Sequence, residues 1–196
     1  MVLVFIDQSD NHIKKASFEA ASYAAAIAKQ TGSTAEALLL GTVADNAASL
    51  GEYGIVKVHT VAQPSLNNFD AQVYTNIIAQ AVNASNADII VFANTTTGKA
   101  IAPRLSVALK AGLVSGAVAL PDTSNGFSVK KTVFSGKAFV QLGIKTEKKI
   151  IALNPNSFNV SKGSGTAEVV PFNATIKDAK AEVVSVSKVT GDVPLR

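Results

Sequence analysis

Residues 88–112 constrain the fold of this chain more than any other part of its sequence. They begin with a short apolar run, 88–93, continue through a Thr-Gly turn, and end in a helix-forming stretch of small residues. A strand that leads through a short turn into a helix is the repeating unit of α/β proteins. Ligands and partners of such proteins gather at the edge where parallel strands end, so a search for function begins at this segment.

The first half of the chain repeats this pattern of an apolar run followed by a helical stretch. The predicted strands are 2–6, 34–40, 55–61 and 88–93, and the predicted helices are 16–30, 44–50, 70–84 and one that follows residue 93. Strands joined by helical crossovers pair in parallel, and runs rich in Val, Ile and Leu are typical of strands buried on both faces. We therefore expect an α/β fold with a mostly parallel sheet and helices on both faces. Ser17 is expected to cap the first helix, and Pro103 to lie near the start of the fourth.

The second half of the chain predicts added antiparallel strands. Short β-type runs separated by turns follow residue 116, and no helix is predicted beyond residue 113. These runs are 117–120, 127–134, 137–144, 148–154, 167–172 and 181–189. The Ser-Lys-Gly-Ser-Gly stretch at 161–165 is expected to be a flexible link. We expect one domain over residues 1–189 and a tail over residues 190–196.

Composition excludes several functional classes. The chain has 196 residues and a formal net charge of +4, but its lysines are scattered along the sequence, which argues against nucleic-acid binding. It has no cysteine, so disulfides, thiolate nucleophiles and cysteine-based metal sites are excluded. The apolar run at residues 2–6 is too short to span a membrane and lacks the flanks of a signal peptide. We expect a soluble cytoplasmic protein without membrane insertion.

Candidate catalytic side chains are few. His12 lies in a charged turn and His59 alternates with apolar residues on a strand, and neither has the partners that a catalytic base or a metal site needs. Asp7 and Asp10 follow the first strand, where they either touch ribose hydroxyls or serve as turn residues. The sequence offers no set of nucleophile, base and orienting residue. We therefore expect no catalytic residue, no metal site and no enzymatic activity of this chain alone.

An anion site at the Thr-Gly turn is the one binding site to which the residues themselves point. Thr97, Gly98 and Lys99 fall at the start of a predicted helix, where backbone N–H groups attract anions and the lysine adds positive charge. Arg104 is expected one turn into that helix, where it either pairs with a carboxylate or contacts a ligand. The alternative is structural, with the threonines capping the helix and Gly98 forming the turn.

Four segments resemble the N-terminal domain of electron transfer flavoprotein alpha subunits. They are residues 2–30, 87–120, 130–158 and 187–196. Matching motifs in the second and third segments are Gly98-Lys99, Pro103-Arg104, Ala108, Gly112 and Gly136-Lys137-Ala138. The resemblance covers essentially the whole chain, and the order and spacing of the segments make it specific. It implies a three-layer fold similar to the Rossmann fold and to adenine nucleotide alpha hydrolases.

Three departures from the family pattern accompany this resemblance. Ser115-Gly116 stands where the family usually has Ser-Asp, and Asn154-Pro155 where it usually has an arginine before the proline. The chain also ends at Arg196, whereas the family continues into a C-terminal domain that holds most of the FAD. The resemblance therefore implies FAD in the complete protein, held mainly outside this chain, and no cofactor-binding residue within it.

The function that the resemblance implies is that of an electron carrier component. With a beta subunit, such a protein passes electrons from acyl-CoA or related dehydrogenases to a quinone reductase or another acceptor. This chain would then be the scaffold and subunit-interface domain on which the flavin domain sits. The alternative is a small adenine-nucleotide-binding α/β domain, which the Thr-Gly-Lys turn at the end of a strand motivates.

Overall fold

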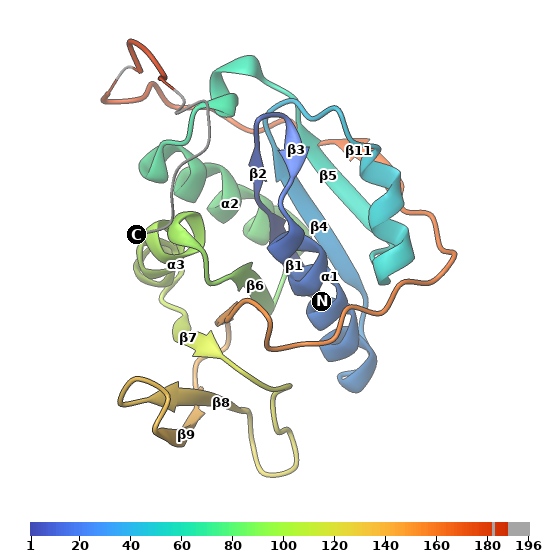
Figure 1. The fold of residues 1–196 in the computed structure, drawn as a ribbon, viewed down its shortest axis with the longest axis vertical. Coiled ribbons are helices and arrows are strands. Elements are labelled where there is room, and N and C mark those ends of the chain that lie inside the picture. The colour runs from blue at the N-terminus through green and yellow to red at the C-terminus, as the bar shows by residue number, and fades with distance from the viewer. Residues whose placement is uncertain (182, 188–196) are drawn as a thin grey trace, which may run out of the picture.

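A nine-stranded sheet forms the centre of the structure, a computed structural model that describes residues 1–181 and 183–187 (Figure 1). The strands lie in the order β11-β5-β4-β1-β6-β10-β7-β8-β9. Their bounds are β1 (Val2–Ile6), β4 (Ala35–Leu40), β5 (Lys57–Val61), β6 (Ile89–Ala93), β7 (Gly112–Ala117), β8 (Ser128–Val133), β9 (Ala138–Gly143), β10 (Lys149–Leu153) and β11 (Glu168–Pro171). A separate two-stranded hairpin consists of β2 (Gln8–Ser9) and β3 (His12–Ile13).

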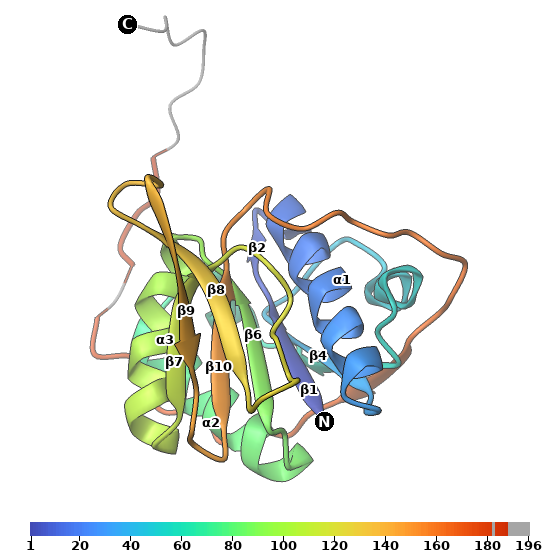
Figure 2. The same ribbon diagram turned by 90° about the horizontal axis from the view of Figure 1, so that it is seen from below.

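Helices cover both faces of the sheet, as predicted (Figure 2). Helix α1 (Lys15–Gln30) and the 3₁₀ helix η1 (Ala47–Tyr53) pack on one face, and α2 (Ala71–Ser85) and α3 (Thr96–Leu109) on the other, with a short 3₁₀ turn η2 (Pro64–Asn67) before α2. Strands from β11 to β7 are parallel. The expected α/β fold with a mostly parallel sheet is therefore confirmed.

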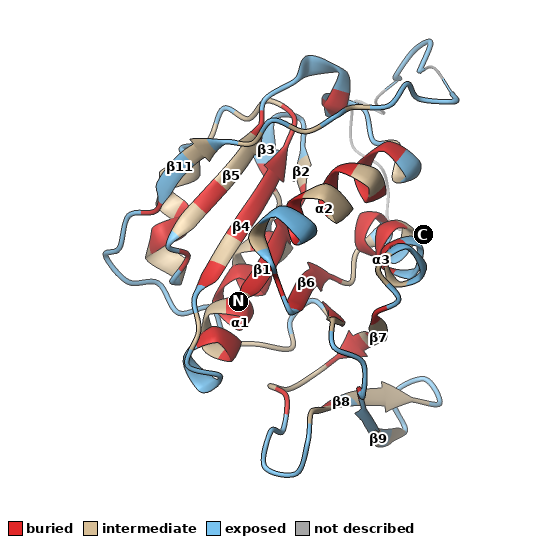
Figure 3. Ribbon diagram, turned by 180° about the vertical axis from the view of Figure 1, so that it is seen from behind, coloured by how far each residue is buried: buried red, intermediate tan, exposed pale blue. Residues whose placement is uncertain are grey.

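The alternation of side chains along β1 divides the core into two layers. Val2, Val4 and Ile6 pack against α1, whereas Leu3 and Phe5 pack against α2 and α3. All five are buried, because successive residues of a strand point to opposite faces and here both faces are covered (Figure 3). This accounts for the unbroken apolar runs in the sequence.

The start of α1 differs from the prediction. The helix begins at Lys15, and its N-cap residue, Lys14, makes no side-chain capping bond. Ser17, the expected cap, is buried inside the helix, where its Oγ accepts a hydrogen bond from the Asp7 N–H and donates one to the Asp7 carbonyl, both at 2.9 Å. The prediction was wrong because this short hydroxyl satisfies the backbone at the end of β1 instead.

The second half of the chain contains fewer antiparallel strands than predicted. Among the described strands of this half, the predicted antiparallel additions are the pairs β7–β8 and β8–β9. Strand β10 enters the sheet in parallel between β6 and β7, and β11 adds in parallel to β5. Strand β10 is buried almost throughout, as is typical of a central parallel strand. Its continuous apolar run could therefore have predicted a parallel strand at this place. Of the predicted strand at 117–120, only Ala117 is in a strand, as the last residue of β7, and residues 118–120 follow it without regular secondary structure.

Residues 154–176, here called the wrapping segment, run from the end of β10 across α1 and η1 to α2. The expected flexible link at 161–165 lies within it but is held in place, since the Gly163 N–H donates to the Glu52 carbonyl at 2.7 Å and Lys162 pairs with the Glu52 carboxylate at 2.8 Å. Further on, Thr175 and Gln80 exchange two hydrogen bonds at 2.9 Å.

The predictions for residues 181–196 can be compared with the structure only in part, because it describes residues 181 and 183–187 of this stretch. The expected strand over 181–189 is absent from residues 181 and 183–187, which have no regular secondary structure. Its remainder and the expected tail over 190–196 lie outside the described residues.

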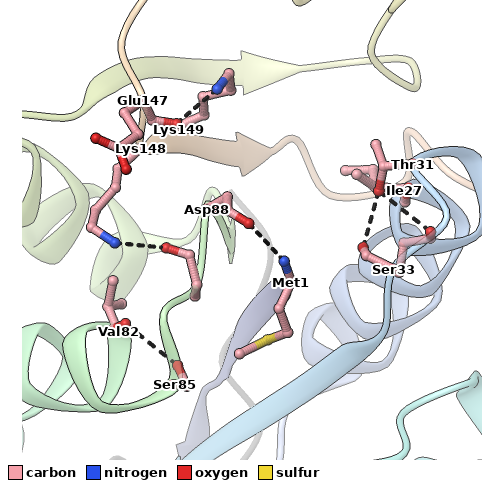
Figure 4. A network of polar contacts seen from close by, with 12 residues as sticks. Met1, Ile27, Thr31, Ser33, Val82, Ser85, Asp88, Glu147, Lys148 and Lys149 are labelled. Atoms are coloured by element: carbon pink, nitrogen blue, oxygen red, sulfur yellow. Dashed lines mark hydrogen bonds and ion pairs between the residues drawn. The ribbon is translucent and has the colours of Figure 1, made fainter.

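Contacts of charged groups connect the residues at the starts of β1, β6 and β10 (Figure 4). The Met1 ammonium donates to the Asp88 carboxylate at 2.8 Å, and the Lys148 ammonium donates to the Ala87 carbonyl at 3.0 Å. Both contacts join residues distant in sequence, so this edge of the sheet is used to fix strand register. The opposite edge, where the strands end, carries the polar residues Asp7, Asn94 and Thr95.

The buried hydroxyl of Tyr74 makes the stability of the fold sensitive to alkaline pH. It donates to the Leu66 carbonyl, and burial, with a smaller effect of the Asp7 charge, raises the pKa of Tyr74 to about 12. A raised phenol pKa contributes stability below the unfolded value near 10 that is lost as pH rises toward 12. We expect the stability difference between wild type and Tyr74→Phe to shift by about 1 kcal/mol in favour of the variant between pH 9 and 11, as measured by urea unfolding. A pH-independent difference would contradict this.

Candidate functional site

The candidate site is the edge of the sheet where β1, β6, β7 and β10 end. Strand β1 lies between β4 and β6, so the chain leaves it toward one side and later returns on the other. Such a reversal of strand order creates a crevice in which ligands of open α/β sheets bind. Asp7 follows β1, and Asn94 and Thr95 follow β6, so these residues line the place where a ligand would be sought.

A buried carboxylate and its partners lie where β1 and β6 end. Asp7 is only 6% exposed, and its Oδ2 accepts bonds from the Lys14 ammonium at 2.8 Å and the Thr95 hydroxyl at 3.3 Å. Together with the backbone bonds from Ser17, these contacts make Asp7 a link between β1, α1 and α3. Of the two predicted interpretations of Asp7, the contacts favour a structural one.

The β2–β3 hairpin, which joins β1 to α1, is fixed beside this crevice by Asp45. Its carboxylate accepts a bond from the Ile13 N–H at 2.6 Å and lies 3.1 Å from His12 Nδ1. The Ile13 bond first, and the His12 contact second, hold the pKa of Asp45 below its usual value. His12 is thus a surface residue with a carboxylate partner. His59 likewise pairs with Glu36 of the neighbouring strand at 2.6 Å, and both fit the structural role expected for them.

A second polar cluster connects the ends of β6, β7 and β10. The Ser115 hydroxyl donates to Asn94 Oδ1 at 3.1 Å, and the Asn94 amide donates to Asn154 Oδ1 at 2.7 Å. Gly116 lies beside it with a φ of 85°. The sequence segments that depart from the family pattern, 115–116 and 154–155, therefore meet in space. Sequence reasoning missed Asn94, although a polar residue directly after a buried strand was a usable signal.

Three of the predicted anion-site residues lie together in the first turn of α3, and Arg104 lies further along this helix. Thr97 is buried and Gly98 lies in the first turn of α3, where its N–H bonds the hydroxyl of the N-cap residue Thr95 at 3.3 Å; Lys99 is exposed. The prediction that a threonine caps the helix is thus confirmed for Thr95. The prediction that Gly98 forms the turn is wrong, because Gly98 lies within α3. A side chain on Gly98 would come within 2.0 Å of the Ala93 carbonyl, so this glycine allows α3 to press against β6.

Arg104 and Pro103 lie further along α3 than predicted. Pro103 is in the middle of the helix rather than near its start, and Arg104 follows it. The Arg104 guanidinium donates to the Ala100 carbonyl of its own helix at 3.2 Å. It also lines a hollow of about 340 Å³ between α2 and α3, together with Gln72 and Asn76. The predicted ion pair is replaced by this backbone contact.

The residues at the end of β1 do not fit the pyrophosphate of a flavin dinucleotide. In dinucleotide-binding α/β folds, glycines in the first strand-to-helix turn let the backbone approach the phosphates. Residues 7–14, which form that connection here, contain no glycine. The Asp7 carboxylate lies in the same place, paired with the Lys14 ammonium at 2.8 Å.

Metal binding and membrane spanning find no support among the residues that the structure describes. They contain no group of three or more His, Cys, Asp or Glu side chains able to hold a metal ion. None of their helices is both long enough and apolar enough to cross a lipid bilayer.

The fold and the site define an open α/β domain with a mostly parallel sheet, in which Asp7, Asn94 and Thr95 make side-chain contacts where the strands end. Comparison with known proteins gives the family. The model of the electron transfer flavoprotein domain matches residues 2–187, and the chain belongs to that family.

Relatives of this chain include several electron-transfer subunits. It is 27% identical over 194 residues to the electron transfer flavoprotein subunit alpha of Bacillus subtilis, which covers 97% of this chain and 59% of the relative. The corresponding subunit of Syntrophomonas wolfei is 26% identical over 85% of this chain and 52% of the relative. Subunit LctC of the NAD⁺- and ferredoxin-linked lactate dehydrogenase of Acetobacterium woodii is 27% identical over 72% of this chain and 34% of the relative. The chain thus spans little more than half the length of the alpha subunits that it matches.

Proposed function

We propose that this chain is the N-terminal scaffold and subunit-interface domain of an electron transfer flavoprotein alpha subunit. The observation that carries the proposal is the match of nearly the whole chain, 97%, to 59% of the Bacillus subtilis alpha subunit. With a beta subunit, the complete protein would pass electrons from acyl-CoA or related dehydrogenases to a quinone reductase or another acceptor. This domain would act as an electron carrier component rather than as an enzyme.

The FAD of such a protein is proposed to lie mainly outside this chain. Supporting this, the Asp7–Lys14 pair lies at the strand ends where a dinucleotide would bind, and Gly98 serves the packing of α3 on β6. The same contacts give the adenine-nucleotide alternative no support, since Thr97 is buried and Arg104 lies away from the start of α3. Thr97, Gly98, Lys99 and Arg104 are therefore not proposed as a site.

The proposed function predicts a stable complex that binds flavin only when its parts are combined. We expect the full chain, co-expressed with a beta-type subunit from the same organism, to co-purify with it and to sediment as a heteromer. The chain alone should be colourless, and a flavin spectrum should appear when a C-terminal flavin domain is supplied as well. An inert monomer without affinity for the beta subunit would overturn the scaffold role. A yellow preparation of the chain alone would overturn the placement of the FAD.

A further inference from the structure

The hairpin formed by β8 and β9 ends the sheet on one side and extends beyond the helices that cover its centre (Figures 1 and 2). Strand β9 is the outermost, and no other described strand pairs with its outer edge. Three large apolar side chains of this hairpin are exposed: Phe134 by 79%, Phe139 by 61% and Leu142 by 38%. An apolar surface at a sheet edge is a common place for another chain to bind.

The backbone of β9 presents a row of hydrogen-bonding groups to this free edge. The Ile144 N–H donates to the Phe127 carbonyl at 2.8 Å, which fixes the alternation of the ladder between the two strands. In an antiparallel pair, every second residue directs its N–H and C=O away from the neighbouring strand. Counting from Ile144, the outward-directed residues of β9 are Gly143, Gln141 and Phe139.

The two edges of the sheet are protected differently. Edge strands in natural proteins are kept from pairing by charged residues, prolines or bulges. The opposite edge strand, β11, has Glu168, which is 64% exposed, and Pro171. Strand β9 has the sequence Ala-Phe-Val-Gln-Leu-Gly, without charge or proline, and its pairing with β8 is continuous. The β11 edge of the sheet has these protective features and the β9 edge lacks them. This difference indicates that a partner covers the β9 edge.

The charge around β9 indicates what kind of partner this is. Residues 128–145 contain four lysines and no acidic residue, a formal charge of +4, whereas the rest of the chain sums to zero. Lys130 lies 4.2 Å above the ring of Phe139, so the positive charge adjoins the exposed apolar surface. Two copies of this hairpin would repel each other, and an acidic segment would be attracted.

We propose that the free edge of β9 binds an acidic, extended segment of a partner protein as an additional strand of the sheet. The outward backbone groups of Phe139, Gln141 and Gly143 supply the hydrogen bonds. The exposed Phe139 contacts the apolar side chains that the incoming strand directs to the same face of the sheet, whereas Leu142 points to the opposite face. The lysines of the hairpin select for acidic residues. Nucleic acid fits less well, because segment 128–145 contains no arginine and a row of backbone donors and acceptors matches a strand. This inference goes beyond the proposed function and holds whichever protein supplies the strand.

The test uses the full chain and a fluorescein-labelled ten-residue peptide of alternating valine and glutamate, followed by fluorescence anisotropy at low salt. Gln141→Pro removes one outward N–H without breaking a backbone bond to β8. It also loses the side-chain bond from Gln141 Nε2 to Ser128 Oγ at 2.9 Å, and Gln141→Ala is the matched control because it loses the same side-chain bond but keeps the N–H. We expect Gln141→Pro to weaken binding at least 10-fold and Gln141→Ala by less than 3-fold. Raising the salt concentration from 50 to 300 mM should weaken binding severalfold.

Three results would overturn the proposal. The first is absence of binding, or equal binding of a peptide with lysine in place of glutamate. The second is binding of a dT₂₀ oligonucleotide that is equal in wild type and Gln141→Pro and tighter than that of the acidic peptide, which would assign the surface to nucleic acid. The third is a wild-type dimer in sedimentation that Gln141→Pro abolishes, which would assign it to a second copy. Should Gln141→Pro fail to fold, an acidic peptide N-methylated at alternate residues provides the second measurement, and undiminished binding of that peptide would equally reject strand addition.

Discussion

Replacing Glu19 by alanine is expected to lower the free energy of unfolding by about 3 kcal/mol, because three charge-assisted hydrogen bonds are lost in a buried place. Glu19 lies in α1 and is 6% exposed. Its carboxylate accepts bonds from the backbone N–H groups of Asn156 at 2.9 Å, Ser157 at 2.8 Å and Phe158 at 2.8 Å. Without it, these three donors at the start of the wrapping segment have no acceptor.

The loss should appear first in the wrapping segment and then in the whole fold. Glu19→Ala should have a lower urea midpoint than wild type and should be cleaved faster by proteases within residues 154–176. Glu19→Gln should be intermediate, because its amide keeps one acceptor oxygen but turns an NH₂ group toward N–H donors. Glu168→Gln is the control: it loses an exposed ion pair with Lys57 at 3.5 Å, which is worth less than about 1 kcal/mol. Equal stability of Glu19→Ala and the control would refute this role of Glu19.

Replacing Gly51 by alanine should destabilise the fold by about 3 kcal/mol through overpacking. The added Cβ would meet the Ala167 nitrogen and the Thr166 carbonyl carbon at 2.3 Å. Both are backbone atoms, which cannot rotate away as a side chain can. The backbone of η1 and the wrapping segment therefore fit together only because residue 51 has no side chain, and β11 begins one residue after this contact.

The control for this substitution is Gly143→Ala. Nothing lies within 4 Å of a Cβ at Gly143, so we expect a change within about 1 kcal/mol, with the reduced freedom of the unfolded chain favouring alanine. Hydrogen exchange should distinguish the two variants further. In Gly51→Ala the amides of Ala167 and Glu168, which bond to the Ala48 and Val56 carbonyls at 3.0 Å, should lose protection. Unchanged protection of these two amides would show that the contact is tolerated.

The elements that sequence could predict are those whose signal is local. The buried strands β1, β4 and β6 and the helices α1 and α2 followed from apolar spacing, because that spacing reflects the faces they bury. The position of β10 did not follow, since pairing between β6 and β7 depends on a chain that returns after the β8–β9 hairpin. The alternation of apolar and polar residues says which faces of a strand are buried but not which strands lie beside it.

The candidate site was predictable as a location but not as an arrangement. The turn after β6 was correctly placed at the edge where the strands end. The partners of Asp7, however, are Lys14, which follows β3, and Thr95, which is 88 residues away from Asp7 in the sequence. Arg104 was misplaced because a proline near a predicted helix start was assumed to mark it, whereas α3 contains Pro103 in its interior. Such contacts are set by tertiary packing, which no local pattern encodes.

The place of β10 in the sheet also has a consequence for the order in which the chain can fold during synthesis. Strands β1, β4, β5 and β6 pair with one another and are complete once residue 93 has been made. Strand β7 pairs only with β10 and β8, so β7, β8 and β9 cannot join the sheet until Leu153 has left the ribosome. During that interval the edge of β6 that β10 will cover is open, and non-local pairings of this kind are formed late. The nascent chain is therefore most exposed to misassembly between the synthesis of residue 93 and that of residue 153.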